Sequence, residues 1–354
     1  MNSIGVVYNN NHELHDYILK GFPSPESPAR LKRILQHFVD NRALENNNCK
    51  VLYPANVSVE DILRVHTADY FSFVQSRSLS GGGWLGNDTY LCEGSFEVLL
   101  QAVGSVLEAG KAVVTGQCDH AFALIRPPGH HACADKHSGF CIFNNAAILA
   151  RHLQHVYSCQ KIAIVNIDAH ASDGTQNIFY ADPSVLCISV HQDPSDFYPF
   201  KGFIREMGSM PALGYTVNME MPQEAGNPEY SIFFEEVGLK VLEQFCPDLV
   251  ILECGFDSYY KEKLAKLNLT VDGYYDSVSR LRSRWHTIVL LEGGYHDDLG
   301  LLADVILQAL ADNRYTKDEV NQVNLLASRQ SSCRRIFDNK LNELKKLMSS
   351  YWEI

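Results

Sequence analysis

Several polar residues of this chain could do chemistry together. Each of them follows a stretch that has the composition of a buried strand. The apolar run Lys161–Ile167 is followed by Asp168 and His170. Side chains two residues apart in an extended segment share one side, so this carboxylate and this imidazole could hold one metal ion. An isolated Asp-x-His is more often a turn carboxylate beside a hydrogen-bonded histidine. The other strand ends favour the metal interpretation.

A second carboxylate, Asp257, follows the apolar run Leu249–Glu253. Asp168, His170 and Asp257 together make a three-ligand set that leaves one position open on a divalent ion. Structural zinc sites fill all four positions, whereas catalytic ones keep one for water or substrate. The three residues therefore predict a catalytic metal centre.

Two more strand ends supply groups for acid and base chemistry. Ala121–Ile125 is followed by the tandem pair His130 and His131, which could take a proton from water and pass one to a leaving amine. Thr287–Leu291 is followed by two glycines and Tyr295, whose O–H could reach a developing oxyanion. The set predicts metal-assisted hydrolysis of an amide.

The elements that must position these residues alternate along the chain. Besides the runs above, we expect strands at Ile4–Tyr8 and Val185–Val190, and helices after Pro28 and at Ser58–Arg64, Thr67–Gln75, Ser95–Ala109, Asn144–His155, Tyr230–Phe245, Val271–Arg284, Leu299–Ala311 and Arg335–Met348. Ser58 and Ser95 are expected N-caps, and Gly81–Gly86 a mobile loop. Alternating strands and helices predict one α/β domain, residues 1–354, in three layers: a mainly parallel sheet with helices on both faces. Residues 315–354 would form a C-terminal helical extension packed on it.

Composition limits the function classes. The chain has 354 residues, 46% hydrophobic, and a net charge of −12, which disfavours direct nucleic-acid binding and suits basic substrates. Its ten cysteines lack paired spacing and are expected to be reduced thiols of an intracellular protein. There is neither a signal-type N-terminus nor an apolar run of about 20 residues, so we expect a cytoplasmic protein without a membrane segment. Self-association through long loops such as Gly81–Cys92 stays open.

Several motifs together resemble one family. RPPGHHACADKHSGFCIFNNAA, NIDAHASDGTQ, SVHQDPSDFYP, ECGFD and LEGGY are similar to motifs of the zinc-dependent histone deacetylase and acetylpolyamine amidohydrolase family. PESPARL and VHTADY fit its N-terminal pattern, so the resemblance covers roughly Ile4 to Leu310. It implies an arginase-like α/β fold and a zinc-dependent enzyme that removes an acyl group from an amine.

The resemblance also implies roles for individual residues. The zinc (Zn²⁺) ligands would be Asp168, His170 and Asp257; His131 would be the general base and acid, His130 its electrostatic partner and Tyr295 the oxyanion donor. Gly139, Phe140 and Tyr198 would line an acyl-lysine tunnel, Asp88 would hold the substrate backbone, and Leu264 would stand at the gatekeeper position. A monovalent cation, K⁺ or Na⁺, would be held by Asp168, His170, Ser189 and backbone carbonyls. From periodicity alone, Phe140 and Tyr198 would be core aromatics and Asp88 a solvated loop residue.

This chain departs from the family at a few positions. Ala171-Ser172 follows the ligand histidine where His-Gly is usual, and Asn166 replaces the aspartate that orients the first tandem histidine. Asp173 keeps the carboxylate for His131. Where the family usually has the turn Pro-Gly-Thr-Gly, this chain has Pro-Phe-Lys-Gly at Pro199–Gly202. Ser24 occupies a position at which the family often has His. These last changes bear on the rim and therefore on substrate choice.

Three functions remain open from the sequence. The first is a zinc amidohydrolase acting on acyl-lysine in proteins or peptides, or on a small acylated amine such as an acetylpolyamine. Polyamine-selective members carry an acidic gatekeeper, whereas Leu264 is uncharged and lies between Lys263 and Ala265, which favours acyl-lysine. The second is a two-manganese ureohydrolase, and the third is a catalytically silent module of the deacetylase type. The intact His130, His131 and Tyr295 argue against the third.

Overall fold

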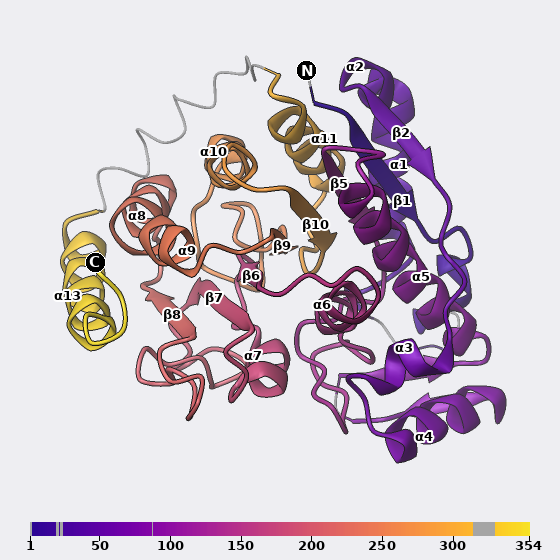
Figure 1. Cartoon of the computed structure of the whole chain (residues 1–354). Coiled ribbons are helices and arrows are strands. Elements are labelled where there is room, and N and C mark those ends of the chain that lie inside the picture. The colour runs from indigo at the N-terminus through magenta and orange to yellow at the C-terminus, as the bar shows by residue number, and fades with distance from the viewer. Residues whose placement is uncertain (1, 19–20, 22–23, 87, 314–329) are drawn as a thin grey trace.

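One parallel sheet forms the centre of the protein. The computed structural model describes residues 2–18, 21, 24–86, 88–313 and 330–354. Across this part, eight strands lie in the order β2-β1-β5-β10-β9-β6-β7-β8, and every pairing between neighbours is parallel (Figure 1). The strands are β1 (Ile4–Tyr8), β2 (Cys49–Leu52), β5 (His120–Leu124), β6 (Ile162–Asn166), β7 (Val185–Gln192), β8 (Thr216–Met221), β9 (Leu249–Cys254) and β10 (Thr287–Leu291).

Helices cover both faces of this sheet, as the alternating pattern predicts. The described helices are α1 (Ala29–Asn41), α2 (Ala43–Asn46), α3 (Val59–Leu63), α4 (Ala68–Leu79), α5 (Ser95–Val114), α6 (Asn145–Val156), α7 (Asp173–Phe179), α8 (Asn227–Phe233), α9 (Leu239–Phe245), α10 (Val271–Arg282), α11 (Leu299–Ala311) and α13 (Gln330–Met348), with short η1 (His12–Leu14) and η3 (Phe234–Gly238). One apolar core joins the sheet to α1, α8, α9, α10 and α11, and a second joins its other face to α3, α4, α5 and α6. The three-layer α/β fold is confirmed.

The central strands are apolar because both of their faces are covered. All residues of β5, β6, β9 and β10 are buried. Strands of this kind show no alternation of polar and apolar residues. Their carboxyl ends meet along one edge of the sheet, which brings the polar residues that follow each strand to one place.

Some local predictions are wrong. Gly81–Gly86 contains strand β3 (Gly82–Trp84), which pairs with β4 (Tyr90–Cys92) in a hairpin. Its glycines are needed for close approach, because a Cβ on Gly82 would lie 2.0 Å from the Leu91 oxygen. The N-cap of α5 is Gly94 with φ +87°, while the Ser95 hydroxyl accepts from the Cys92 amide instead. The expected helix Tyr230–Phe245 is α8 and α9 with one π-helical segment, η3, between them.

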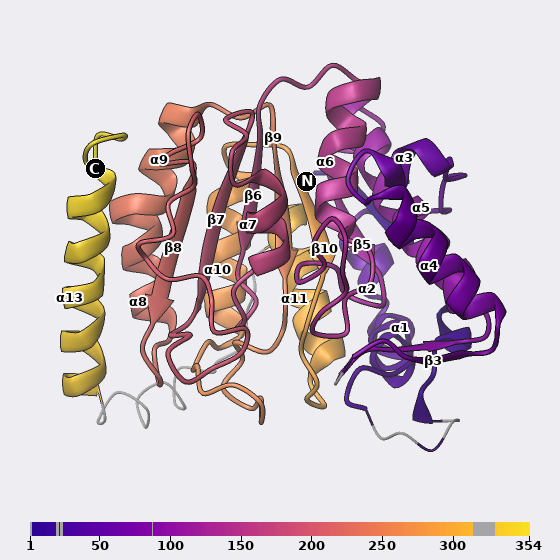
Figure 2. The ribbon, with the colours of Figure 1, turned by 90° about the horizontal axis from the view of Figure 1, so that it is seen from below.

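The sheet edge at β8 is covered by the C-terminal helix. Figure 2 shows α13 at one end of the molecule beside α8 and β8. Lys340 of α13 bonds Asp193 and Glu220, and the Trp352 indole N–H donates to the Gly214 carbonyl at 2.8 Å. The expected helix Arg335–Met348 is therefore present, whereas residues 315–329 of the predicted extension lie outside the described residues. Among the described helices, none has the length and apolar content that a membrane crossing requires.

Candidate active site

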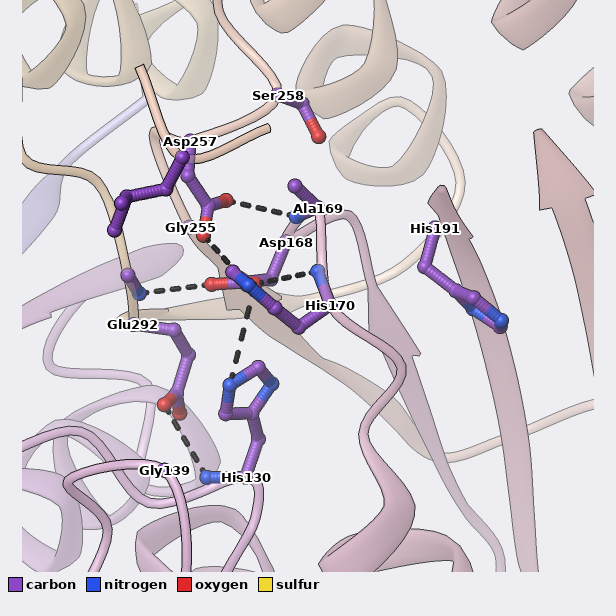
Figure 3. A network of polar contacts seen from close by, with 12 residues as sticks. His130, Gly139, Asp168, Ala169, His170, His191, Gly255, Asp257, Ser258 and Glu292 are labelled. Atoms are coloured by element: carbon purple, nitrogen blue, oxygen red, sulfur yellow. Dashed lines mark hydrogen bonds and ion pairs between the residues drawn. The ribbon is translucent and has the colours of Figure 1, made fainter. Parts of the chain in front are cut away.

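The three predicted metal ligands converge at the carboxyl ends of β6 and β9. His170 Nδ1 lies 3.0 Å from Asp168 Oδ1 and 3.0 Å from Asp257 Oδ2. Their candidate ligand atoms all lie within 4.8 Å of one another. Figure 3 shows the three side chains pointing toward one another from two separate loops. Residues 87 positions apart thus form one cluster because their strands are hydrogen-bonded neighbours.

Backbone amides fix the orientation of both carboxylates. Asp168 Oδ2 accepts from the Gly293 amide at 2.8 Å, and Asp257 Oδ1 accepts from the Ala169 amide at 2.7 Å. One oxygen of each carboxylate is used in this way and the other faces His170. Gly255 is required beside them, because a Cβ there would lie 1.9 Å from Asp168 Oδ2. The donor set, two oriented carboxylate oxygens and an imidazole nitrogen, fits a zinc ion.

The electrostatics of this cluster point to a bound cation. Burial would lower the pKa of His170, but its bonds to Asp168 and Asp257 raise it to about 10. Burial and the neighbouring Asp168 raise the pKa of Asp257 to about 7, whereas the pKa of Asp168 is held below its usual range by the histidines around it. Two buried carboxylates beside one imidazole place negative charge at this site, and a divalent ion held between the three side chains would balance that charge.

The tandem histidines lie against this cluster with different partners. His131 Nδ1 donates to Asp173 Oδ1 at 2.7 Å, and Asp173 is the first residue of α7. His130 Nδ1 lies 3.3 Å from Asn166 Oδ1, and its Nε2 lies 4.0 Å from Asp168 Oδ1. Burial, and then the adjacent His131, lower the pKa of His130 to about 3. Asp173 thus lies beside His131 and Asn166 beside His130, which are the pairings that the family resemblance implies.

Tyr295, the predicted oxyanion donor, is held in place by residues from distant segments. Its amide donates to Glu262 Oε2 at 2.8 Å, and the Arg30 guanidinium lies 4.9 Å from its ring centroid. Arg30 Nε also donates to the Gly294 carbonyl at 2.8 Å. Burial raises the pKa of the Tyr295 hydroxyl well above its usual value, so this group keeps its proton and can donate it in a hydrogen bond. The sequence reasoning missed Arg30, whose only signal was its place in PESPARL.

A cavity of about 270 Å³ contains the cluster and the predicted substrate residues. Its lining includes all three metal candidates, both tandem histidines and Tyr295, together with Asp88, Gly139, Phe140, Tyr198 and Leu264. Pro128, Phe197 and Gly293 also line it, and the sequence reasoning did not assign them there. Gly139 has φ +53° and lies against His131, since a Cβ there would be 2.4 Å from that ring. Leu264 is 49% exposed, which suits a position at the entrance.

Two of the groups predicted to hold a monovalent cation accept hydrogen bonds from the Asn166 side chain. Asn166 Nδ2 donates to the His170 carbonyl at 2.9 Å and to Ser189 Oγ at 3.0 Å. Ser189 Oγ also lies 2.8 Å from His191 Nδ1. The cation stays a prediction.

Two buried acids beneath the histidines were not recognised as part of the site. Glu292 Oε2 accepts from the Gly129 amide at 2.8 Å and the His130 amide at 3.3 Å. Glu253 Oε1 accepts from the Thr175 hydroxyl at 2.6 Å, and burial raises the pKa of Glu253 to about 8. Burial raises the pKa of Glu292 further above its usual value. In the sequence, the feature that could have indicated a role for these two acids was their position at the ends of β9 and β10.

This cluster at the strand ends of a parallel α/β fold is compatible with more than one kind of hydrolase, and comparisons with known proteins identify the family. A family model described as "Histone deacetylase domain" matches residues 24–310, and the chain belongs to the histone deacetylase family. A "Probable deacetylase" of Archaeoglobus fulgidus is 33% identical over 96% of this chain and 97% of its own. A "Histone deacetylase-like amidohydrolase" of Pseudomonas aeruginosa is 32% identical over 77% of this chain and 72% of its own. The solved HDA15 HD domain matches with a TM-score of 0.88 at 28% identity, over 99% of this chain and 95% of that one.

Proposed function

We propose that this deacetylase is a zinc enzyme that removes an acetyl or other acyl group from the side-chain amine of lysine in proteins or peptides. The observation that carries the proposal is the convergence of Asp168, His170 and Asp257 in a cavity that aromatic side chains also line. Such a cavity suits an extended acyl-lysine side chain, whose methylenes would lie between Phe140 and Tyr198. The ten free cysteines support a cytoplasmic location for the enzyme, because thiols stay reduced in the cytoplasm.

The metal would bind at the three ligands, and the protein residues would move the protons. When bound, zinc would polarise the amide carbonyl and make an attacking water more acidic. His131 would accept the proton of that water and deliver it to the nitrogen of the leaving amine. Asp173 would keep the His131 ring oriented, because it accepts from Nδ1 and leaves Nε2 facing the cavity.

The remaining groups would stabilise charge. Tyr295 would donate its O–H to the oxygen that becomes negative during attack, from the side away from the metal. His130 would stay neutral because burial lowers the pKa of its ring. Asn166 would hold that ring without adding a charge. The chain thus pairs one charged dyad, His131 with Asp173, and one neutral dyad, His130 with Asn166.

The entrance favours lysine over polyamine substrates. Leu264 lines the cavity and is uncharged, so it offers nothing to the free ammonium groups of an acetylpolyamine. Glu262 accepts from the amides of Lys263, Leu264 and Tyr295, which ties its carboxylate to the backbone. Lys261 is paired with Asp298 at 2.6 Å, so it repels a polycation less than its position in the sequence suggests. Selectivity would therefore rest mainly on Leu264.

The other two functions are less well supported. A two-manganese ureohydrolase needs a set of ligands for a second metal ion. Among the described residues, the second cluster of candidate metal ligands is made of His130, Cys141 and Glu292. Manganese prefers carboxylate, carbonyl and water oxygens, whereas this cluster offers one carboxylate beside a thiol and an imidazole. A silent module is disfavoured because His131 and Tyr295 face the same cavity as the metal candidates.

A comparison of substrates tests the proposal. We expect a higher kcat/KM for an acetyl-lysine peptide than for acetylspermidine or acetylputrescine, and we expect Leu264→Glu to narrow the difference. Leu264→Gln is the matched control for size and polarity without charge. Both substrates should be measured at two salt concentrations, because the net charge of −12 could attract polyamines over a long range. Faster turnover of acetylpolyamines that falls steeply with salt would contradict the lysine assignment.

A further inference from the structure

The turn that departs from the family pattern places a lysine behind the proton-transfer dyad. Pro199–Gly202 follows β7, and Lys201 Nζ lies 3.7 Å from Asp173 Oδ2. The Lys201 side chain is 54% exposed, whereas that of Asp173 is 7% exposed. Lys201 therefore brings a charge from the surface to a nearly buried carboxylate.

The backbone next to Lys201 is held at Gly202 by two hydrogen bonds. His191 Nε2 donates to the Gly202 carbonyl at 2.9 Å, and the Gly202 amide donates to Glu206 Oε2 at 3.1 Å. The ion pair with Asp173 thus comes from an anchored turn.

The same turn packs closely against the segment that follows the ligand histidine. Gly202 has φ +90°, and a Cβ there would lie 2.5 Å from the Cβ of Ala171. Gly202 therefore lies close to the Ala171 side chain, which places the turn that carries Lys201 against the segment between His170 and Asp173.

The two oxygens of Asp173 have separate partners. Oδ1 accepts from His131 Nδ1 at 2.7 Å, and Oδ2 faces the Lys201 ammonium. We propose that Lys201 is a positioning residue for proton transfer: its ammonium holds Oδ2 of Asp173, so that Oδ1 stays directed at His131. This inference rests on the proposed function, in which His131 moves the proton. Lys201 does not line the cavity, so it acts through Asp173 and not on the substrate.

The expected effect is modest because one partner is exposed. Ion pairs with an exposed member contribute weakly, and a lysine on a flexible stem holds its partner loosely. We expect Lys201→Met, which keeps the aliphatic stem and removes the charge, to lower kcat about two- to fivefold with KM unchanged. Lys201→Arg should restore most of the loss, since a guanidinium can reach the same oxygen. Lys111→Met is the matched control, because Lys111 is 49% exposed and pairs with Glu108 on α5.

The experiment is steady-state kinetics on an acetyl-lysine peptide, with the zinc content and melting temperature of each variant measured alongside. A lower kcat in Lys201→Met, recovery in Lys201→Arg and no change in Lys111→Met would support the inference. Wild-type kcat in Lys201→Met would overturn it. Equal losses in Lys201→Met and Lys201→Arg, or a change confined to KM, would overturn it as well. A wild-type enzyme without activity on any acyl-lysine peptide would instead contradict the proposed function.

Discussion

Replacing Tyr295 by phenylalanine isolates the oxyanion contribution. The change removes one O–H and keeps the ring, so the contacts with Arg30 at 4.9 Å and with Phe140 at 5.9 Å between ring centroids should persist. The backbone is held independently, since the Tyr295 amide donates to Glu262 and Arg30 donates to Gly294. The variant should therefore fold and bind zinc as the wild type does.

The magnitude follows from what the hydroxyl would do. One donor aimed at a developing oxyanion in a water-poor site contributes about 10²–10³ in kcat. The donor acts on charge that appears in the transition state, so KM should change little. Tyr295→Phe should accordingly lower kcat by about 10²–10³ with near-normal KM.

The matched control is the second tyrosine of the cavity. The Tyr198 hydroxyl bonds Ser138, so Tyr198→Phe removes one neutral hydrogen bond from the wall. Such a bond contributes about 1 kcal/mol, and kcat should change by less than about tenfold. The assay is steady-state deacetylation of a fluorogenic acetyl-lysine peptide with zinc content measured in parallel. A Tyr295→Phe enzyme with near-normal kcat, or with a loss equal to that of Tyr198→Phe, would refute the assignment.

Two further outcomes follow from the site. His131→Ala should lose at least about tenfold more kcat than His130→Ala, within the ~10²–10⁴ that acid and base catalysis contributes, because the Nδ1 of His131 donates to a carboxylate whereas the Nδ1 of His130 faces an amide oxygen. Equal losses would show that the histidines share the proton transfer. The pKa of Glu253, raised to about 8, predicts that metal-free protein loses stability as pH rises from about 4.3, where an unfolded Glu ionises, through about 8. Glu253→Gln should flatten this decline in melting temperature between pH 5 and 9, and an unchanged decline would mean that Glu253 is ionised in the folded protein.

The strand ends were predictable because local composition determines them. β6, β9 and β10 are continuous apolar runs, and a polar residue directly after such a run has to lie at the edge of the sheet. That rule predicts that Asp168 and Asp257 lie at the same edge of the sheet, and the pairing of β6 with β9, which local composition does not reveal, brings them together. β8 was missed because its buried face carries Asn218 and Glu220, whose partners come from distant segments.

Contacts between loops could not be predicted from local pattern. Lys201 meets Asp173 and Arg30 meets Tyr295 only because the fold brings separate loops together. Neither pair has a spacing that a strand or helix period would reveal. Phe140 and Tyr198 likewise look like core aromatics by periodicity, and the family motifs alone predicted their place in the cavity wall.

The metal content of Asp257→Asn tests the central claim most directly. Asp257 Oδ2 is one of the three proposed zinc ligand atoms, and an amide at this position keeps the size of the side chain but binds zinc poorly. Elemental analysis should find about one zinc per chain in the wild type and almost none in the variant, with deacetylase activity lost and the circular dichroism spectrum retained. A folded Asp257→Asn protein that keeps a full equivalent of zinc would contradict the proposed metal site.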